Sequence, residues 1–355
     1  MSTQEWRHGL LAELLAAYGP CGQEDAVRDI CARELGPYVD EMWVDPAGNL
    51  VGLIRGAQPD TAPGVRVFAH LDELSMIVKR IEANGDLVVS PMGTMYPANF
   101  GLGPVAILGD RELCHGILTL GSEHTTSESM RIWQTKPDQG DHALDWSHVY
   151  VFTGRTPEQL AEAGVAIGTR VCVADSKRTL VEVGDYLGCY FMDDRAALVV
   201  SLATARALRD EPPAGDVHLV FSTSEEMGGI GATYASRVLP GEVSLALDVA
   251  PTEAEYQTVV TADPVVAYYD TAVLYDKAIA DRLVALGEEL GLSPQRGVFG
   301  AYESDASNAK AKGQTARAAM LGLSTLSTHG YEAIHSGLLD NCIRLLTAFL
   351  RDPRI

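Results

Sequence analysis

Apolar runs that end in polar residues recur along this chain and predict a parallel sheet. The clearest are VRVFAHLD (65–72), HLVFSTSEE (218–226) and VSLALDVA (243–250). Near-continuous apolar runs are typical of strands buried on both faces, which is the usual situation in parallel sheets. The polar residues follow each run, and the carboxyl ends of parallel strands meet at one edge of the sheet. We therefore expect these polar side chains to lie close together.

Segments with helical spacing of apolar residues alternate with these strands. RAALVVSLATARALRD (195–210) precedes the second strand, and GIGATYASRVL (229–239) lies between the second and the third. This alternation indicates an α/β fold with helices on both faces of the sheet. Before it, residues 1–55 predict two helices and a hairpin that turns at DPAGN (45–49).

The last ninety residues continue the pattern with further helices and a strand. In chain order we expect a helix at 270–291, a loop at 297–313, a strand at 316–323 and a final helix at 338–350. The segment 74–185 differs, because it has short β-like runs separated by glycine and proline. It predicts a small β-barrel domain inserted into an α/β domain formed by 1–73 and 186–355.

Composition and charge narrow the class of function. The 355 residues carry a formal net charge of −21, which argues against nucleic-acid or anionic-membrane partners. No stretch approaches the roughly 20 apolar residues that span a bilayer, and the acidic N-terminal helix is unlike a signal peptide. The six cysteines form no CxxC pattern and indicate reduced thiols. We expect a cytoplasmic protein.

Candidate metal ligands lie where the predicted strands end. His70 and Asp72 close the first apolar run, and Asp248 stands alone among the apolar residues of the third. A buried carboxylate without a partner is costly, so a cation is its simplest partner. Residues two apart on an extended backbone point to the same side. Asp72 can therefore orient the imidazole of a metal-bound His70.

Two pairs of adjacent acids extend this set. Asp193-Asp194 precedes a helix, and neighbouring carboxylates repel unless a cation compensates them. We assign Asp193 as a ligand that bridges two metals, with Asp194 suited to capping the helix. Glu225-Glu226 ends the second strand, where adjacent side chains point in opposite directions. Glu226 is then a ligand, and Glu225 is the base that takes a proton from water.

One more nitrogen ligand completes the inventory for two divalent cations. His329 in STHGYE is one candidate and His335, six residues later, is the other. The spacing alone does not decide between them.

The order of these motifs resembles that of the glutamyl aminopeptidase family, the tetrahedral (TET) group of dinuclear-metal aminopeptidases. The similar segments are DPAGNLVG, AHLDE (69–73), DDR (193–195), EEMGGIGA (225–232), ESDAS (303–307) and the last histidine segment. The resemblance places the metals at His70, Asp193, Glu226, Asp248 and His329, the general base at Glu225 and the orienting carboxylate at Asp72.

The resemblance also implies an architecture and a reaction. It implies a mixed sheet flanked by helices, of the phosphorylase/peptidase type, and a PDZ-like insert that dimerises or gates substrate. It further implies homo-oligomers, as hollow tetrahedral dodecamers that admit short peptides. We expect an aminopeptidase with two divalent ions per subunit, zinc first, with cobalt or manganese as alternatives.

Three other functions are compatible with parts of the pattern. An N-acyl amino-acid or peptide deacylase would use the same two-metal site on blocked N-termini. A glycosidase needs two carboxylates roughly 5–9.5 Å apart across a sugar, which the diverging Glu225 and Glu226 do not offer. A non-catalytic peptide-binding protein would have no need for a complete ligand set.

Overall fold

The computed structural model describes residues 3–138, 140 and 142–353. Its contacts divide the chain into two compact units. The first contains the described residues up to Glu73, Leu180–Thr328 and those from Glu332 onward. The second contains Leu74–Thr179 and His329–Tyr331. We expected the inserted segment to extend to residue 185; the structure groups 180–185 with the first unit, where Val181–Val183 pairs with Tyr186–Tyr190.

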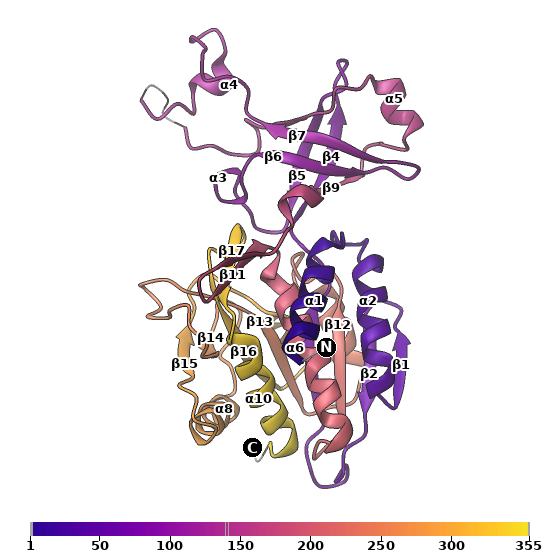
Figure 1. The fold of residues 1–355 in the computed structure, drawn as a ribbon, viewed down its shortest axis with the longest axis vertical. Coiled ribbons are helices and arrows are strands. Elements are labelled where there is room, and N and C mark those ends of the chain that lie inside the picture. The colour runs from indigo at the N-terminus through magenta and orange to yellow at the C-terminus, as the bar shows by residue number, and fades with distance from the viewer. Residues whose placement is uncertain (1–2, 139, 141, 354–355) are drawn as a thin grey trace. The chain divides into compact units, whose positions relative to one another are not determined.

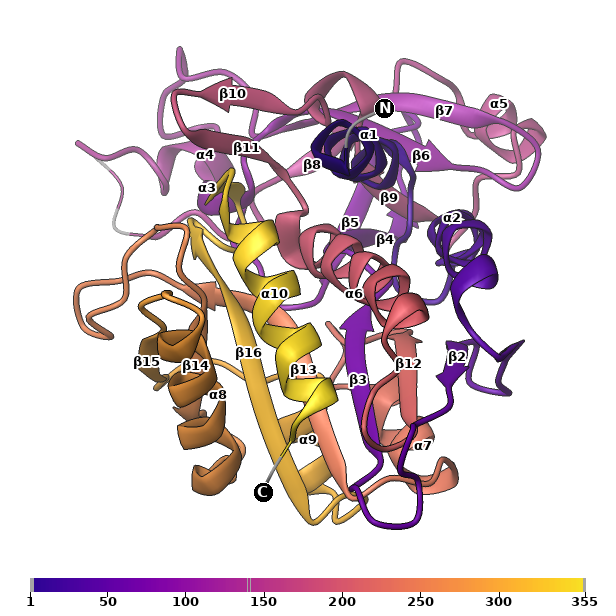
Figure 2. The ribbon, with the colours of Figure 1, turned by 60° about the horizontal axis from the view of Figure 1, so that its bottom comes forward.

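Four parallel strands form the centre of the first unit (Figure 1). They are β3 (Val65–His70), β12 (Val217–Ser222), β13 (Val243–Pro251) and β16 (Arg317–Leu326), all four of which are labelled in Figure 2. β3 pairs in parallel with β12 and β13, and β13 pairs in parallel with β16. Every residue of β3 and β12 is buried, as their near-continuous apolar runs predict. These four strands therefore bring their last residues to one edge of the sheet.

Further strands, most of them in antiparallel pairs, extend this centre into an eleven-stranded mixed sheet. The strand order is β1-β2-β12-β3-β13-β16-β17-β11-β10, and β14 and β15 branch from β16. The outer strands are β1 (Glu41–Val44), β2 (Leu50–Ile54), β10 (Val181–Val183), β11 (Tyr186–Tyr190), β14 (Val265–Tyr269), β15 (Gln295–Val298) and β17 (Tyr331–His335).

Helices cover both faces of this sheet. α6 (Met192–Asp210) packs on β3, β12 and β13, and α10 (Leu338–Arg351) packs on β16 and α6. Figure 2 shows α6 and α10 lying across the strands. On the opposite face, α7 (Ile230–Val238) packs on β12, and α9 (Asp305–Ala311) packs on β3, β13 and β16. The remaining helices of this unit are α1 (Thr3–Ala16), α2 (Asp25–Leu35), η1 (Gly36–Tyr38) and α8 (Lys277–Glu289).

Small residues let α7 approach the sheet closely. Val51, Phe68 and Val220 come from three adjacent strands and pack against Ala232 and Ala235 of the helix. All five side chains are buried. Burial of a large apolar side chain contributes about 1.5–3 kcal/mol, so this contact helps to fix α7 and the loop that precedes it.

The segment predicted as a loop at 297–313 contains a helix. Ser304 precedes α9, and its side chain accepts a hydrogen bond from the Ser307 N–H at 3.3 Å. In return the Ser307 side chain accepts from the Ser304 N–H at 2.8 Å. This reciprocal pair is a capping box with serine in place of the usual Glu or Gln. The loop prediction was wrong for Asp305–Ala311 because that substitution hides the helix start.

A closed barrel of six antiparallel strands forms the second unit, and it confirms the predicted β-barrel. The strand order is β4-β5-β8-β7-β6-β9. The bounds are β4 (Ser75–Ile81), β5 (Leu87–Met92), β6 (Gly103–Leu108), β7 (Leu113–Thr119), β8 (Tyr150–Phe152) and β9 (Arg170–Val173). Short helices lie in its connections, namely α3 (Pro97–Phe100), α4 (Met130–Trp133), α5 (Pro157–Glu162) and η2 (Asp175–Lys177).

The fold class predicted from sequence, α/β with a mixed sheet and an additional β-barrel, is therefore confirmed. Each of the six cysteines is a buried free thiol. Among the described residues, no helix combines the length and apolarity that crossing a bilayer requires.

Candidate metal centre

The carboxyl ends of β3 and β13 bring the first two candidate ligands together. His70 is the last residue of β3. Asp248 lies on β13 two residues beyond Ala246, which pairs with Phe68 of β3. Asp248 is therefore level with His70 on the neighbouring strand, and both side chains are buried.

The start of α6 adds Asp193 and Asp194 to these residues. The chain enters the helix through Phe191, which has a left-handed backbone (φ 65°), and the Asp193–Asp194 peptide bond is cis. His70 Nε2 lies 2.9 Å from Asp193 Oδ1. The His70 N–H donates to Asp194 Oδ2 at 3.0 Å. From the sequence we considered Asp194 suited to capping this helix. Instead its carboxylate binds the backbone of β3, and no side chain caps α6.

Four side chains form a cluster in which a metal ion fits. The ligand atoms of His70, Asp193, Asp194 and Asp248 all lie within 4.8 Å of one another. Burial raises the pKa of both Asp194 and Asp248 well above the ordinary value; repulsion between carboxylates adds to this and His70 opposes it. Asp194 Oδ1 is buried without a hydrogen-bond partner among the described residues. A divalent cation would offset the repulsion and give this oxygen a partner.

The protonation of His70 depends on the same carboxylates. Burial alone would lower its pKa, but hydrogen bonds with Asp193 and Asp72 raise the pKa well above the ordinary value. Its Nδ1 lies 3.1 Å from the Asp72 carbonyl oxygen and 3.5 Å from Asp72 Oδ1. A metal ion can bind Nε2 only when this nitrogen carries no proton, so metal binding at His70 is expected to compete with protons.

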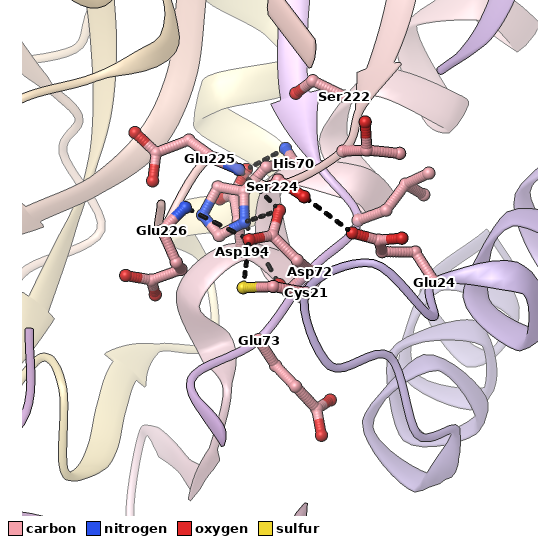
Figure 3. A network of polar contacts seen from close by, with 12 residues as sticks. Cys21, Glu24, His70, Asp72, Glu73, Asp194, Ser222, Ser224, Glu225 and Glu226 are labelled. Atoms are coloured by element: carbon pink, nitrogen blue, oxygen red, sulfur yellow. Dashed lines mark hydrogen bonds and ion pairs between the residues drawn. The ribbon is translucent and has the colours of Figure 1, made fainter. Parts of the chain in front are cut away.

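Asp72 also holds the backbone of the two glutamates that follow β12 (Figure 3). The Glu225 N–H donates to Asp72 Oδ1 at 2.9 Å, and the Glu226 N–H donates to Oδ2 at 3.1 Å. The Cys21 thiol donates to the same Oδ2 at 3.1 Å. Asp72 is fully buried, and together with His70 these donors keep its pKa below the ordinary value despite burial.

We predicted that Glu225 and Glu226 end the second strand, and this prediction was wrong. β12 ends at Ser222, and the glutamates lie in a turn. Ser224 has a positive φ of 52°, which an alternating strand pattern does not reveal. Burial raises the pKa of Glu225 well above the ordinary value; His70 opposes the rise and the negative charge of Asp248 adds to it.

The two candidate histidines of the C-terminal segment have different surroundings. His329 belongs by its contacts to the second unit, and its Nδ1 lies against the carbonyl oxygen of Thr94. His335 lies on β17, where its Nδ1 accepts a hydrogen bond from the Gly337 N–H at 3.0 Å. Its ring also makes an edge-on contact with Tyr186, so these contacts account for His335 without a metal.

A buried ion pair holds the turn that carries Asp72. Arg195, of the DDR motif, lies 2.6 Å from Glu73, and neither side chain is exposed. The guanidinium also donates to the carbonyl oxygen of Leu71 and, at 3.4 Å, to that of Asp72. Breaking a buried pair of this kind costs roughly 3–5 kcal/mol. Arg195 therefore stabilises the chain path between His70 and Glu73.

Several residues around the centre were not predicted. Asp305 of α9 accepts a hydrogen bond from the Ser222 hydroxyl, and burial raises its pKa to about 6. Glu332 Oε2 accepts from the Asp193 N–H at 3.0 Å. Both belong to segments that carried the family resemblance, ESDAS and STHGYE. The sequence therefore pointed to these segments, but it gave no role to Asp305 or Glu332. Cys21 showed no such signal.

Comparison with known proteins identifies chains that are similar in sequence. A model of the M42 glutamyl aminopeptidase family matches residues 48–345. Lysyl aminopeptidase of Pyrococcus furiosus is 27% identical over 243 residues, which cover 68% of this chain and 65% of that protein. This chain therefore aligns with slightly less than two thirds of that relative.

Solved structures share the whole fold. The aminopeptidase APDkam598 of the archaeon Desulfurococcus kamchatkensis superposes with a TM-score of 0.88 at 23% identity, covering 99% of this chain and 96% of that one. The TET1 peptidase of Pyrococcus horikoshii, described as assembling into a tetrahedron or a large octahedral shell, has a TM-score of 0.82 at 19% identity. The match covers 98% of this chain and 99% of that one. At these identities the likeness shows the fold alone.

Proposed function

This chain belongs to the M42 glutamyl aminopeptidase family, and from that premise we propose that it is a metal-dependent aminopeptidase that releases N-terminal residues from short peptides. The observation that carries the proposal is the buried cluster of His70, Asp193, Asp194 and Asp248, which fits a divalent cation. The turn that bears Glu225 is tied to the same region through Asp72. A ligand cluster and a nearby carboxylic acid are what metal-assisted peptide hydrolysis requires.

We further propose that the site holds two divalent ions, with zinc as the first choice and cobalt or manganese as alternatives. When bound, such ions lower the pKa of a coordinated water and polarise the scissile carbonyl. Asp194, which we had assigned elsewhere, lies within the cluster and is a further candidate for holding an ion. The proposed ligands are His70, Asp193, Glu226, Asp248 and His329.

In this proposal Glu225 moves the proton. It takes a proton from the attacking water and returns it to the leaving amine. Burial raises the pKa of Glu225 above the ordinary value of a carboxyl group, and this is the direction that favours a carboxylate as a general base. Asp72 binds the Glu225 N–H and also faces His70, so one carboxylate sets the position of the base and the orientation of a ligand.

The remaining expectations belong to the same proposal. The three relatives described above are each named an aminopeptidase or a peptidase, so the deacylase alternative gains no support. We propose a homo-oligomer on the model of the TET1 peptidase, in the cytoplasm, with the barrel unit serving as a PDZ-like dimerisation or substrate-gating domain.

The test is a cleavage assay on paired free and N-acetylated short peptides, with metal and after chelation. We expect release of single N-terminal residues from the free peptides only, and its loss on chelation. Glu225→Gln should lower kcat by at least about a hundredfold, because general acid–base catalysis contributes roughly 10²–10⁴-fold. Glu182→Gln, on the exposed strand β10, is the matched control and should keep full activity. Cleavage of the blocked peptides alone would contradict the proposal.

A further inference from the structure

The connection between α1 and α2 runs beside the candidate metal centre. Pro20 forms a β-bridge with Glu73, and the Glu73 N–H donates to the Gly19 carbonyl oxygen at 2.9 Å. This connection lies before residue 48, where the family match begins. The residues that reach the centre from here are therefore assigned by none of the motifs discussed above.

Cys21 is the residue of this connection that touches the site. Its side chain is 2% exposed, and its thiol donates to Asp72 Oδ2 at 3.1 Å. Burial, together with the negative charge of Asp72, raises the pKa of the thiol well above its ordinary value, so it remains a hydrogen-bond donor. The other partners of the Asp72 carboxylate oxygens are the N–H groups of Glu225 and Glu226 and the ring of His70.

Glu24, at the end of the same connection, contacts the loop that bears the glutamates. Its side chain is 4% exposed, and its Oε1 accepts from the Gly22 N–H at 2.7 Å. The same oxygen accepts from the Ser224 hydroxyl at 3.3 Å. Ser224 has the positive φ that turns the chain toward Glu225. The connection thus holds this loop at two points, through Asp72 and through Ser224 (Figure 3).

We propose that Cys21 is a positioning residue for the general base, because its thiol holds the Asp72 carboxylate that binds the backbone of Glu225 and Glu226. Without the thiol, Asp72 Oδ2 loses one of its donors inside the protein, where a hydrogen bond to a charged group is strong. The carboxylate is then less constrained and so is the turn that it holds. Functional groups need this kind of supporting contact to keep their geometry. This inference rests on the proposed role of Glu225.

Hydrogen exchange tests the structural part without any activity. The variants are Cys21→Ala, which removes the donor, Cys21→Val, which fills the space without a donor, and Cys21→Ser, which keeps one. Cys31→Ala is the matched control, because Cys31 is also a fully buried thiol, on the neighbouring α2. In Cys21→Ala and Cys21→Val, amides of the segment 223–229 should exchange about tenfold faster than in the wild type. They should stay within about twofold in Cys21→Ser and Cys31→Ala.

Kinetics test the consequence for the base. We expect kcat for free peptides to fall about tenfold in Cys21→Ala and Cys21→Val with KM little changed, and to be retained in Cys21→Ser. Equal exchange and equal kcat in Cys21→Ala and Cys31→Ala would overturn the proposal, as would a Cys21→Ser variant that behaves like Cys21→Ala. If the wild type cleaves no peptide, the proposed function fails, and the exchange experiment still decides whether Cys21 holds the turn.

Discussion

The acidic residues at the edge of the parallel strands lie closer together than their charges favour. Asp193, Asp194 and Asp248 share a buried space with one histidine, and burial raises the pKa of the last two of these acids. Asp72 differs from them, because it accepts hydrogen bonds from two backbone N–H groups and a thiol, which favour its charged form. The surroundings of the four aspartates therefore differ: a cation would stabilise the charged forms of Asp193, Asp194 and Asp248, whereas hydrogen bonds stabilise the charged form of Asp72.

A histidine remote from these residues should make stability depend on pH. His218 of β12 is 4% exposed, with its ring edge-on to Trp43, and burial lowers its pKa from the ordinary 6.5. The unfolded chain binds this proton near pH 6.5 and the folded protein only at lower pH. The free energy of unfolding therefore falls as the pH is lowered through 6.5, by at most about 1.4 kcal/mol per pH unit.

His218→Phe should remove this part of the pH dependence. The measurement is the thermal midpoint of wild type and variant at pH 7.5 and 5.5, and the loss between the two should be smaller in the variant. His115→Phe is the control, because His115 is exposed on β7 and should leave the wild-type dependence unchanged. An identical loss in wild type and His218→Phe would contradict the prediction.

At the scale of elements, the path of the loop after β12 depends on the close approach of Gly231, in α7, to Asn49 and Thr223. A Cβ on Gly231 would come within 2.2 Å of Asn49 Oδ1 and 2.6 Å of the Thr223 backbone. Asn49 in turn accepts from the Thr223 N–H at 2.9 Å and donates to the Gly231 carbonyl at 2.9 Å. Only glycine lets α7 begin this close to β12. Gly231 of EEMGGIGA therefore fixes where the loop that bears the two glutamates joins α7.

The start of α9 offers a test of how an element supports the centre. Ser304→Ala removes the cap that binds the Ser307 N–H and a buried contact with the Tyr275 hydroxyl at 2.7 Å. We expect a loss of about 1–2 kcal/mol in the free energy of unfolding, since a cap and a buried hydrogen bond are both lost. Amide exchange in α9, which carries Asp305, should also become faster.

Thr156→Ala is the matched control for that variant. Thr156 forms the capping box of α5 in the barrel unit, where its side chain accepts from the Gln159 N–H at 3.3 Å in an exposed setting. It should lower stability less and leave exchange in α9 unchanged. If Ser304→Ala leaves α9 exchange at the wild-type level, the cap does not hold this helix.

At the scale of the whole molecule, metal removal should destabilise the elements that carry the proposed ligands. A ligand that binds only the folded state stabilises it by about 4 kcal/mol when present at a thousand times its Kd. Chelation should therefore lower the thermal midpoint. It should also speed amide exchange at 192–198 and 243–251, and leave β6 and β7 of the barrel unchanged.

Asp248→Asn provides the comparison for metal removal. The variant keeps the shape of the side chain and removes one charge from the cluster, so zinc should shift its midpoint less than that of the wild type. Equal midpoints for loaded and chelated wild-type protein would argue against a resident metal.

Local pattern predicted much of this molecule. Continuous apolar runs identified the parallel strands, and strand polarity placed His70 and Asp248 at one edge, because burial and side-chain period are properties of the segment itself. The pattern did not predict helix α9, because its capping box uses an unusual pair of serines. The pattern did not predict the turn at Ser224 either, because a positive φ in a non-glycine residue does not change the hydrophobic pattern.

The sequence by itself determined where the main parallel strands lie along the chain and that a barrel is inserted into the α/β domain. It also determined which residue types are available to hold a metal. Tertiary structure alone decided which distant groups meet. Cys21 and Asp72 are 51 positions apart, and Ser222 and Asp305 are 83 apart. Such contacts depend on the packing of whole helices and loops against the sheet, and no single segment encodes them. The residue types of the candidate centre were therefore readable in the chain, and the contacts that hold those residues in place became visible only in the fold.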